Sequence, residues 1–198
     1  MIPAKQVAST HLHQLSDVFE RIDLDALERV FERLRAARDN GSTIFVAGNG
    51  GSAATATHWA NDLGKATKRS GQVPIRVLSL ADSMPWLTAL ANDEGYDRVF
   101  SGQLGNFARP EDVLVVISAS GNSPNLLRAV EMANQRGVST VGLLGFDGGS
   151  LKSMVDDFVW VPTELGAYEL AEDCHMTICH ILSMSLTLDR RPRGPEIR

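Results

Sequence analysis

A run of small polar residues directly follows the most apolar stretch of the chain. Residues 113–117 (VLVVI) are apolar and mostly β-branched, and residues 118–123 (SASGNS) come next, before a helical pattern that starts at Pro124. This order predicts a buried strand, a tight turn and a helix N-terminus, whose unpaired N–H groups and positive dipole end favour an anion. Gly121 lets the backbone approach a ligand closely. The added hydroxyl donors are Ser118, Ser120 and Ser123. We therefore predict a phosphate-binding turn.

Two other segments, residues 48–52 (GNGGS) and 145–149 (GFDGG), are also glycine-rich and also follow predicted strands. The first matches G-x-G-x-x-A, a weak dinucleotide fingerprint. That fingerprint also needs an acid at the end of the next strand, roughly 20 residues on. The nearest candidate, Asp82, lies 34 residues after Gly48 and beyond the strand end. The sequence therefore predicts no nucleotide cofactor.

Histidines and carboxylates recur on two predicted helices. His58 and Asp62 are four residues apart, so they share one face of their helix. On the last helix, Glu172 and His180 point to neighbouring sides, within reach of one pocket. Such a set suits general acid–base chemistry or a divalent metal. The alternatives are a surface pair for His58 and Asp62, and a core histidine bonded to a carbonyl for His180.

Strand and helix patterns alternate along the chain from residue 43. Expected strands are 43–47, 74–80, 113–117, 140–145 and 158–161. Expected helices are 4–20, 24–38, 52–68, 85–108 with a break near 93–95, 124–135 and 167–188. This alternation predicts an α/β fold, with a parallel sheet covered on both faces. In such sheets, ligands bind beyond the carboxyl ends of the strands.

Bulk properties narrow the class of protein further. The 198 residues predict one domain, 1–198, in which helices 1–40 precede an α/β core at 41–190. The leading helices either pack on their own sheet or form a subunit interface. A net charge of −5 argues against nucleic acid as a partner. The charged, proline-rich tail, 190–198, is expected to be frayed.

The sequence also predicts the cellular location of the protein and the state of its two cysteines. No apolar run reaches membrane-spanning length and the first residues are too polar for a signal peptide, so we expect a cytoplasmic protein with no membrane partner. Cys174 and Cys179 are five residues apart and are interpreted as reduced structural thiols rather than metal ligands.

Taken together, these motifs resemble the sugar isomerase (SIS) domain family, and within it the phosphoheptose isomerases. The matching segments are 48–63, 87–104, 116–137, 143–151 and 172–182. The resemblance implies a three-layer, flavodoxin-like sandwich with a five-stranded parallel sheet, and a homotetramer with active sites near subunit boundaries. It also implies interconversion of a ketose phosphate, sedoheptulose 7-phosphate, with an aldose phosphate. Some members of the family bind zinc.

The resemblance assigns substrate-binding roles to both polar turns. The matching positions are Asn49, Gly51, Ser52, Asp93, Ser118, Ala119, Ser120 and Ser123. The three serines correspond to the phosphate loop, in which Ala119 stands where a threonine is common. Asp93 corresponds to an acidic residue near the substrate.

The resemblance also assigns catalytic and metal-binding roles, with two departures. His58 matches a metal ligand, and His180 matches the general acid, which also ligates metal. Asp62 stands where a catalytic glutamate is expected, and Glu172 where a glutamine ligand is expected; Glu169 replaces an aspartate nearby. We predict catalysis by Asp62, Glu172 and His180. The predicted metal ligands are His58, Asp62, Glu172 and His180, and the predicted divalent metal is zinc.

The sequence therefore favours an aldose–ketose isomerase that acts through an enediol. Because an aspartate is one methylene shorter than a glutamate, its carboxylate reaches about 1.5 Å less far. An isomerase for a different sugar phosphate is one alternative. A non-catalytic sugar-phosphate-binding protein, of the kind that assists a replication initiator, is the other.

Overall fold

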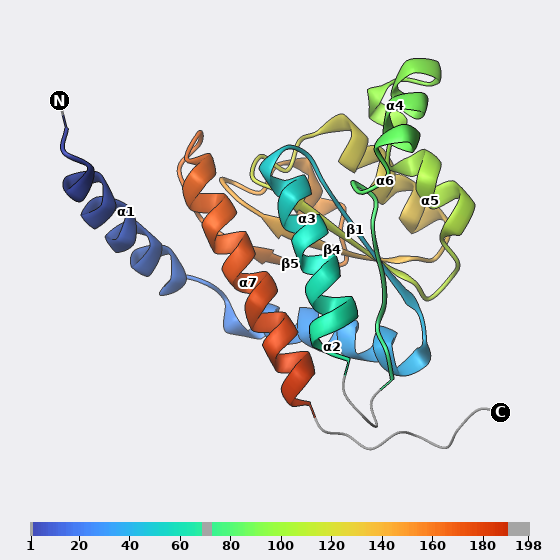
Figure 1. Ribbon diagram of the computed structural model, residues 1–198, viewed down its shortest axis with the longest axis horizontal. Coiled ribbons are helices and arrows are strands. Elements are labelled where there is room, and N and C mark those ends of the chain that lie inside the picture. The colour runs from blue at the N-terminus through green and yellow to red at the C-terminus, as the bar shows by residue number, and fades with distance from the viewer. Residues whose placement is uncertain (1, 69–72, 190–198) are drawn as a thin grey trace.

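The computed structural model describes residues 2–68 and 73–189, which form a parallel sheet between two layers of helices (Figure 1). The sheet has five strands in the order β2-β1-β3-β4-β5, and every neighbouring pair is parallel. The strands are β1 (Thr43–Gly48), β2 (Arg76–Ser79), β3 (Val113–Ser118), β4 (Ser139–Leu144) and β5 (Asp157–Trp160). The predicted α/β class and five-stranded parallel sheet are confirmed.

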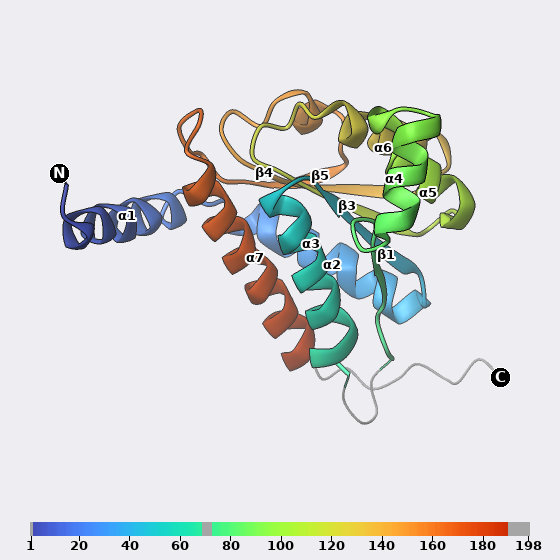
Figure 2. The same cartoon turned by 45° about the horizontal axis from the view of Figure 1, so that its top comes forward.

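Both faces of the sheet are buried, as strands without polar alternation require. On β3, Val113, Val115 and Ile117 join one apolar cluster, while Leu114 and Val116 join the other. Figure 2 shows a different set of helices on each side of the sheet. One side carries α2 (Leu24–Asn40), α3 (Gly51–Asn61) and α7 (Tyr168–Leu188). The other carries α4 (Met84–Asp93), α5 (Ser101–Phe107) and α6 (Pro124–Gln135).

Three short helices lie between these elements. They are the π-helix η1 (Asp62–Ala66) and the 3₁₀-helices η2 (Tyr96–Arg98) and η3 (Ser150–Ser153). The predicted break near residues 93–95 is the boundary between α4 and η2, where Gly95 has a φ of 105°. None of the helices within the described ranges combines the length and the hydropathy needed to traverse a bilayer.

The two leading helices have different surroundings. The first, α1 (Ala4–Phe19), extends away from the sheet, and Val18 is its buried residue (Figure 1). Its His11 lies 2.7 Å from Asp173 of α7, measured between Nε2 and Oδ2. The second, α2, begins after Asp23, which is its N-cap: the Asp23 side chain accepts hydrogen bonds from the N–H groups of Asp25 and Ala26.

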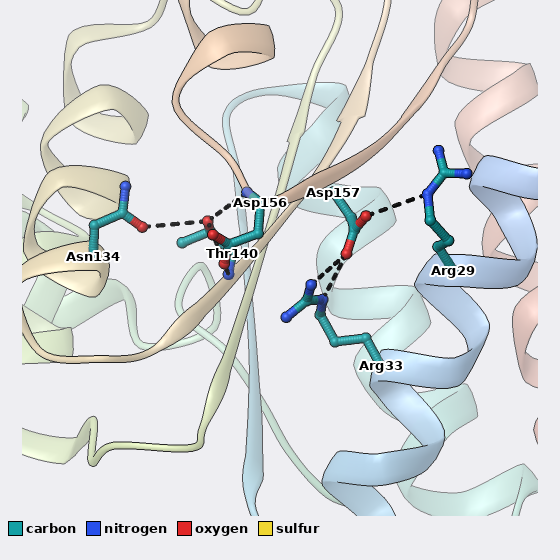
Figure 3. Close-up of polar contacts among 6 residues, drawn as sticks. All are labelled: Arg29, Arg33, Asn134, Thr140, Asp156 and Asp157. Carbon is teal, nitrogen blue, oxygen red and sulfur yellow. Dashed lines mark hydrogen bonds and ion pairs between the residues drawn. The ribbon is translucent and has the colours of Figure 1, made fainter.

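Ion pairs and hydrogen bonds attach the last strand to both of its neighbours (Figure 3). Asp157 of β5 accepts a hydrogen bond from Arg33 Nε at 2.9 Å and forms an ion pair with Arg29, both on α2. The preceding Asp156 accepts a hydrogen bond from the Thr140 N–H of β4 at 2.8 Å. These contacts place α2 against the edge of the sheet, so that α2 covers a face shared with α7.

The strand order locates the place where a ligand should bind. The chain leaves β1 for β2 on one side and then returns to β3 on the other, so the connections diverge between β1 and β3. At such a switch point, the loops beyond the carboxyl ends of the two strands separate and leave a crevice. The predicted anion turn follows β3, and the first glycine-rich turn follows β1. The predicted frayed tail, 190–198, lies outside the described residues.

Candidate functional site

A cavity of about 300 Å³ lies at this switch point, and we call it the serine cavity. The turn after β1, the turn after β3 and the start of α7 enclose it. Its lining is Asn49, Gly50, Gly51, Ser52, Ile117, Ser118, Ala119, Ser120, Ser123, Leu126, Tyr168 and Glu172. Seven of the eight predicted substrate-binding residues therefore line one cavity, Asp93 being the exception.

The serine turn is held in shape by its own hydrogen bonds and by close backbone packing. Ser118 Oγ accepts a hydrogen bond from the Gly121 N–H at 2.9 Å, and Ser120 Oγ accepts one from the Asn122 N–H. Gly121 has a φ of 64°, and a Cβ there would lie 1.9 Å from the carbonyl oxygen of Gly148. Only glycine allows this approach, so the glycine-rich turn 145–149 packs directly against the serine turn and supports it.

The side chain of Asn49 is held in the cavity by three hydrogen bonds. Its amide group and that of Asn125, at the start of α6, donate to one another at 2.8 and 2.9 Å. The Tyr96 hydroxyl donates to Asn49 Oδ1 at 3.0 Å. This pair of hydrogen bonds connects the turn after β1 with the helix after the serine turn, and Asn125 is buried.

Glu172 lies in the serine cavity, against the first residue of α3. A Cβ on Gly51 would lie 2.2 Å from Glu172 Oε1 and 2.3 Å from Oε2, so the carboxylate occupies the space that a side chain at position 51 would need. The N-terminal end of α3 carries a partial positive charge that attracts anions. This end therefore faces both the cavity and the Glu172 carboxylate.

Three of the four predicted metal ligands form a separate group, which we call the His–Asp–His cluster: His58, Asp62 and His180. The two imidazole Nε2 atoms are 3.3 Å apart. Asp62 Oδ2 lies 3.4 Å from Nε2 of His58 and 3.6 Å from that of His180. His58 and Asp62 share a helix face, as their spacing predicted.

These distances match the donor set that zinc prefers. With metal–ligand bonds of 2.0–2.1 Å, the edge of a tetrahedron is about 3.3 Å, close to the separations in the cluster. Two imidazoles and one carboxylate are common ligands of catalytic zinc. Asp62 is also the first residue of the π-helix η1, and π-helical turns are frequent at functional sites. The cluster therefore fits a divalent metal ion.

The structure keeps Glu172 and Asp93 away from this cluster. Glu172 and His180 are eight residues apart on α7, about 12 Å along the helix axis. Asp93 is exposed at the end of α4 and accepts a hydrogen bond from the Asn92 side chain at 2.7 Å. Within the described residues, the predicted site residues thus fall into a cavity, a cluster and one outlier.

The inward side of α7 carries titratable groups with shifted pKa values. Burial lowers the pKa of His175 to about 4, against a smaller opposing effect of the Leu144 backbone. Burial raises the pKa of Cys174 to about 11 and that of Cys179 well above its ordinary value. Both thiols are therefore protonated at neutral pH, which agrees with their interpretation as structural and argues against thiolate ligands.

The sequence did not predict three polar residues of the site. Tyr168 lines the serine cavity, and Asn125 and Tyr96 hold Asn49. Asn125 carried a usable signal, because it follows Pro124 at the start of the helix that the anion turn introduces. Tyr168 and Tyr96 lie far from the polar turns in sequence, so only the fold brings them near.

Comparison with known proteins identifies the family of the chain. The family model described as "SIS domain" matches residues 10–145. A phosphoheptose isomerase from Geobacter metallireducens is 40% identical over 177 residues, which are 87% of this chain and 92% of that protein. A phosphoheptose isomerase from Chlorobaculum parvum is 36% identical over 170 residues, covering 85% of this chain and 81% of the relative.

A solved structure leads to the same family. The phosphoheptose isomerase from Neisseria gonorrhoeae superposes with a TM-score of 0.84 at 29% identity, over 93% of this chain and 98% of that chain. The family match covers more than half of the residues, and the sequence relatives align over most of their length. The chain therefore belongs to the SIS domain family, and within it to the phosphoheptose isomerase branch.

Proposed function

We propose that this protein is an aldose–ketose isomerase that converts sedoheptulose 7-phosphate to the corresponding heptose 7-phosphate through an enediol. The observation that carries the proposal is the serine cavity, in which an anion-binding turn faces a carboxylate across a space large enough for a small ligand. The names of the sequence relatives support the choice of substrate.

Each side of the serine cavity has its own role in this proposal. Ser118, Ser120 and Ser123, with the N-terminal end of α6, bind the phosphate. Asn49, Gly51 and Ser52 contact the sugar, and the backbone of Ala119 contributes to the phosphate turn. Asp93 keeps its predicted substrate role only if another subunit brings it near a cavity.

The chemistry requires one base and one group that moves protons at oxygen. A carboxylate, Asp62 or Glu172, removes a proton from the carbon next to the carbonyl, and His180 transfers a proton at the sugar oxygens. His58, Asp62 and His180 would hold a divalent metal, which we propose to be zinc. When bound, this ion supplies a Lewis acid that stabilises negative charge on oxygen.

We also propose that the protein is a cytoplasmic homotetramer in which the leading helices, 1–40, form subunit contacts around the α/β core, 41–190. The extension of α1 away from the sheet supports this role (Figure 1). The half-exposed imidazoles of His58 and His180 also suit a site that a neighbouring subunit completes. Buried, protonated thiols are compatible with a reducing compartment.

A second candidate is an isomerase for a different sugar phosphate. The shorter Asp62 and the charged Glu172 favour it, because each changes the reach or the charge of the site relative to the family pattern. A sugar-phosphate-binding protein without activity is disfavoured by the His–Asp–His cluster, since binding alone does not need three converging metal ligands.

The test is to incubate the full-length protein with sedoheptulose 7-phosphate in D₂O, with and without added zinc, and follow the substrate by NMR. We expect an aldose product that carries deuterium at C2. Binding of the substrate without turnover or deuterium exchange would favour the non-catalytic alternative. Turnover of other ketose phosphates in preference to the heptulose would favour the second candidate.

A further inference from the structure

We propose that Tyr168 is a substrate-binding residue, whose hydroxyl donates a hydrogen bond to the phosphate end of the bound sugar. Phe146 is the positioning residue that holds the ring of Tyr168 at the serine cavity. This inference rests on the proposed function, which supplies the sugar phosphate. It gives a role to a cavity residue that neither the sequence motifs nor the family resemblance identified.

The first observation is the location of Tyr168. It is the first residue of α7 and lines the serine cavity. Glu172, one turn later on the same face of α7, also lines the cavity, about 6 Å further along the helix axis. The Tyr168 side chain is half-exposed, and its hydroxyl has no hydrogen-bond partner among residues 2–68 and 73–189. The hydroxyl can therefore donate to a ligand in the cavity.

The second observation is the contact that holds the Tyr168 ring. The rings of Phe146 and Tyr168 meet edge to face, with their centroids 5.1 Å apart and their planes at 75°. This arrangement is one that aromatic pairs prefer. Phe146 is buried, so a fixed side chain supports one side of a half-exposed ring. A ring that is already restrained loses less conformational freedom when a ligand binds.

The third observation is how Phe146 itself is held. Its φ is 45°, in a region that bulky side chains rarely adopt. Such a conformation persists only where the surrounding structure determines it. The Phe146 N–H donates to Thr163 Oγ1 at 3.2 Å, and Trp160 Nε1 donates to the Phe146 carbonyl oxygen at 2.9 Å. Phe146 is therefore bonded on both sides to the segment that leads from β5 towards α7.

The fourth observation shows which end of the ligand Tyr168 can reach. Phe146 forms a small buried cluster with Ala119 of the serine turn and Ala171 of α7. A Cβ on Gly145 would lie 2.9 Å from the Ala119 carbonyl oxygen and 3.1 Å from the Ala171 Cβ. The first turn of α7 thus packs directly against the serine turn. Tyr168, which rests on Phe146, lies on the side of the cavity where the phosphate is expected.

The charges of the two α7 side chains agree with this division. The carboxylate of Glu172 repels a phosphate, and it lies against Gly51 of the other turn. The phenol of Tyr168 is an uncharged donor, and a hydrogen bond to a charged phosphate oxygen is stronger than one between neutral groups. The phosphate does not react during isomerisation, so this bond is equally strong in the ground state and the transition state. Its loss should therefore raise KM and leave kcat unchanged.

The experiment compares Tyr168→Phe with the wild type in the full-length protein, because this substitution removes the hydroxyl and keeps the ring. Inorganic phosphate is titrated by calorimetry, and kinetics are measured with sedoheptulose 7-phosphate at saturating zinc. We expect phosphate to bind about tenfold more weakly and KM to rise about tenfold, with kcat within about twofold of the wild type. An unchanged phosphate affinity with a raised KM would place the hydroxyl at the sugar and overturn the proposal. A lower kcat with unchanged KM would also contradict it, because Tyr168 would then act in the chemical step.

Phe146→Leu tests the positioning role, since it removes the aromatic partner of Tyr168. In this background, Tyr168→Phe should weaken phosphate binding by less than about threefold, because an unsupported ring no longer presents its hydroxyl. Additive losses in the double variant would contradict the role of Phe146. Phe107→Leu is the matched control: it breaks an edge-to-face pair with Trp86, at 5.3 Å and 71°, between residues that do not line the cavity. Its phosphate affinity and KM should equal those of the wild type.

Thermal unfolding reports whether each variant is folded, and Tyr168→Phe alone decides the hydrogen bond if Phe146→Leu does not fold. Phosphate binding also separates this inference from the proposed function. A wild type that binds phosphate without turnover or deuterium exchange contradicts the isomerase function, while the phosphate affinity of Tyr168→Phe still decides the role of the hydroxyl. A wild type that binds no phosphate contradicts both. An active wild type whose phosphate affinity and KM are unchanged in Tyr168→Phe contradicts the role of Tyr168 alone.

Discussion

The serine cavity and the His–Asp–His cluster both include residues of α3 and α7, but different parts of the chain form them. Backbone turns shape the cavity: Gly121 packs on Gly148, and Gly51 lies under Glu172. Three side chains form the cluster, and its two imidazoles are about half exposed. Substitutions that add a side chain should therefore disturb the cavity, whereas substitutions that remove a ligand side chain should disturb the cluster.

Two helices, α3 and α7, connect the serine cavity with the His–Asp–His cluster. Glu172 at the start of α7 belongs to the cavity, and His180, about two turns further, belongs to the cluster. Helix α3 likewise contributes Gly51 to the first region and His58 to the second. Trp59 Nε1 of α3 donates to Ser183 Oγ of α7 at 3.0 Å in the core between them. The pair of helices thus sets the separation of the two regions.

His180→Ala should have the largest effect and should act on the cluster alone. Losing one of two imidazoles removes a metal ligand and the proposed proton-transfer group, so we expect kcat to fall about 1,000-fold and zinc affinity at least tenfold. Steady-state kinetics and zinc titration measure these effects. Phosphate binding in the serine cavity should change little; its loss would mean that the two regions are not independent.

Gly121→Ala should damage the cavity through the backbone. The new Cβ would meet the Gly148 carbonyl oxygen at 1.9 Å, at a φ of 64° that disfavours side chains. We expect the free energy of unfolding to fall by about 3 kcal/mol, measured by urea denaturation, together with loss of phosphate binding. Gly41→Ala, also at positive φ but with open space around its Cβ position, is the control for strain without a clash.

His175 tests the core behind both regions through pH. Its pKa is about 4 in the folded protein and near 6.5 in the unfolded chain, so the unfolded state binds more protons between these values. Stability should therefore decrease as pH falls from 6.5 towards 4, by about 2 kcal/mol between pH 6.5 and 5. Urea denaturation at several pH values measures this slope, and His175→Leu should remove that part of it. An unchanged slope in the variant would assign the pH dependence to other groups.

Ser120→Ala should have the smallest effect. It removes one hydroxyl from the anion turn but leaves the N-terminal end of α6 and the other serines, so we expect phosphate to bind about tenfold more weakly. The fold should be unaffected, as judged by thermal unfolding. Isothermal titration with inorganic phosphate gives the affinity, and Ser153→Ala, on an exposed hydroxyl of η3, is the matched control.

The fold was predictable because its signals are local. Unbroken apolar runs such as residues 113–117 predict strands buried on both faces, and the apolar period of residues 24–38 predicts α2. The π-helix at Asp62–Ala66 was not predicted. A single wide turn at the end of a helix leaves the apolar pattern of the preceding residues unchanged, so the sequence looks like a continuous α-helix.

The site was predictable only where residues close together in the sequence form it. The serine turn follows from β3 and α6 alone, and the pairing of His58 with Asp62 follows from one helix. Glu172 was grouped with the metal ligands because helical spacing gives the direction of a side chain around the axis, which says little about distance along it. Asp93 was placed near the substrate by resemblance, whereas in the protomer the turn at Gly95 leaves it exposed on α4.

The amide pair of Asn49 and Asn125 limits what the sugar-contacting turn can recognise. Asn49 Oδ1 accepts from both Asn125 and the Tyr96 hydroxyl, so both of its lone pairs are used, and one of its two amide protons is donated to Asn125. The one hydrogen-bonding group that Asn49 still has free is an amide N–H. This side chain therefore selects for an oxygen that can accept, such as a carbonyl or the anion that develops from it. An aspartate at position 49 would have no N–H to donate, and one of its carboxylate oxygens would face the Asn125 Oδ1 acceptor.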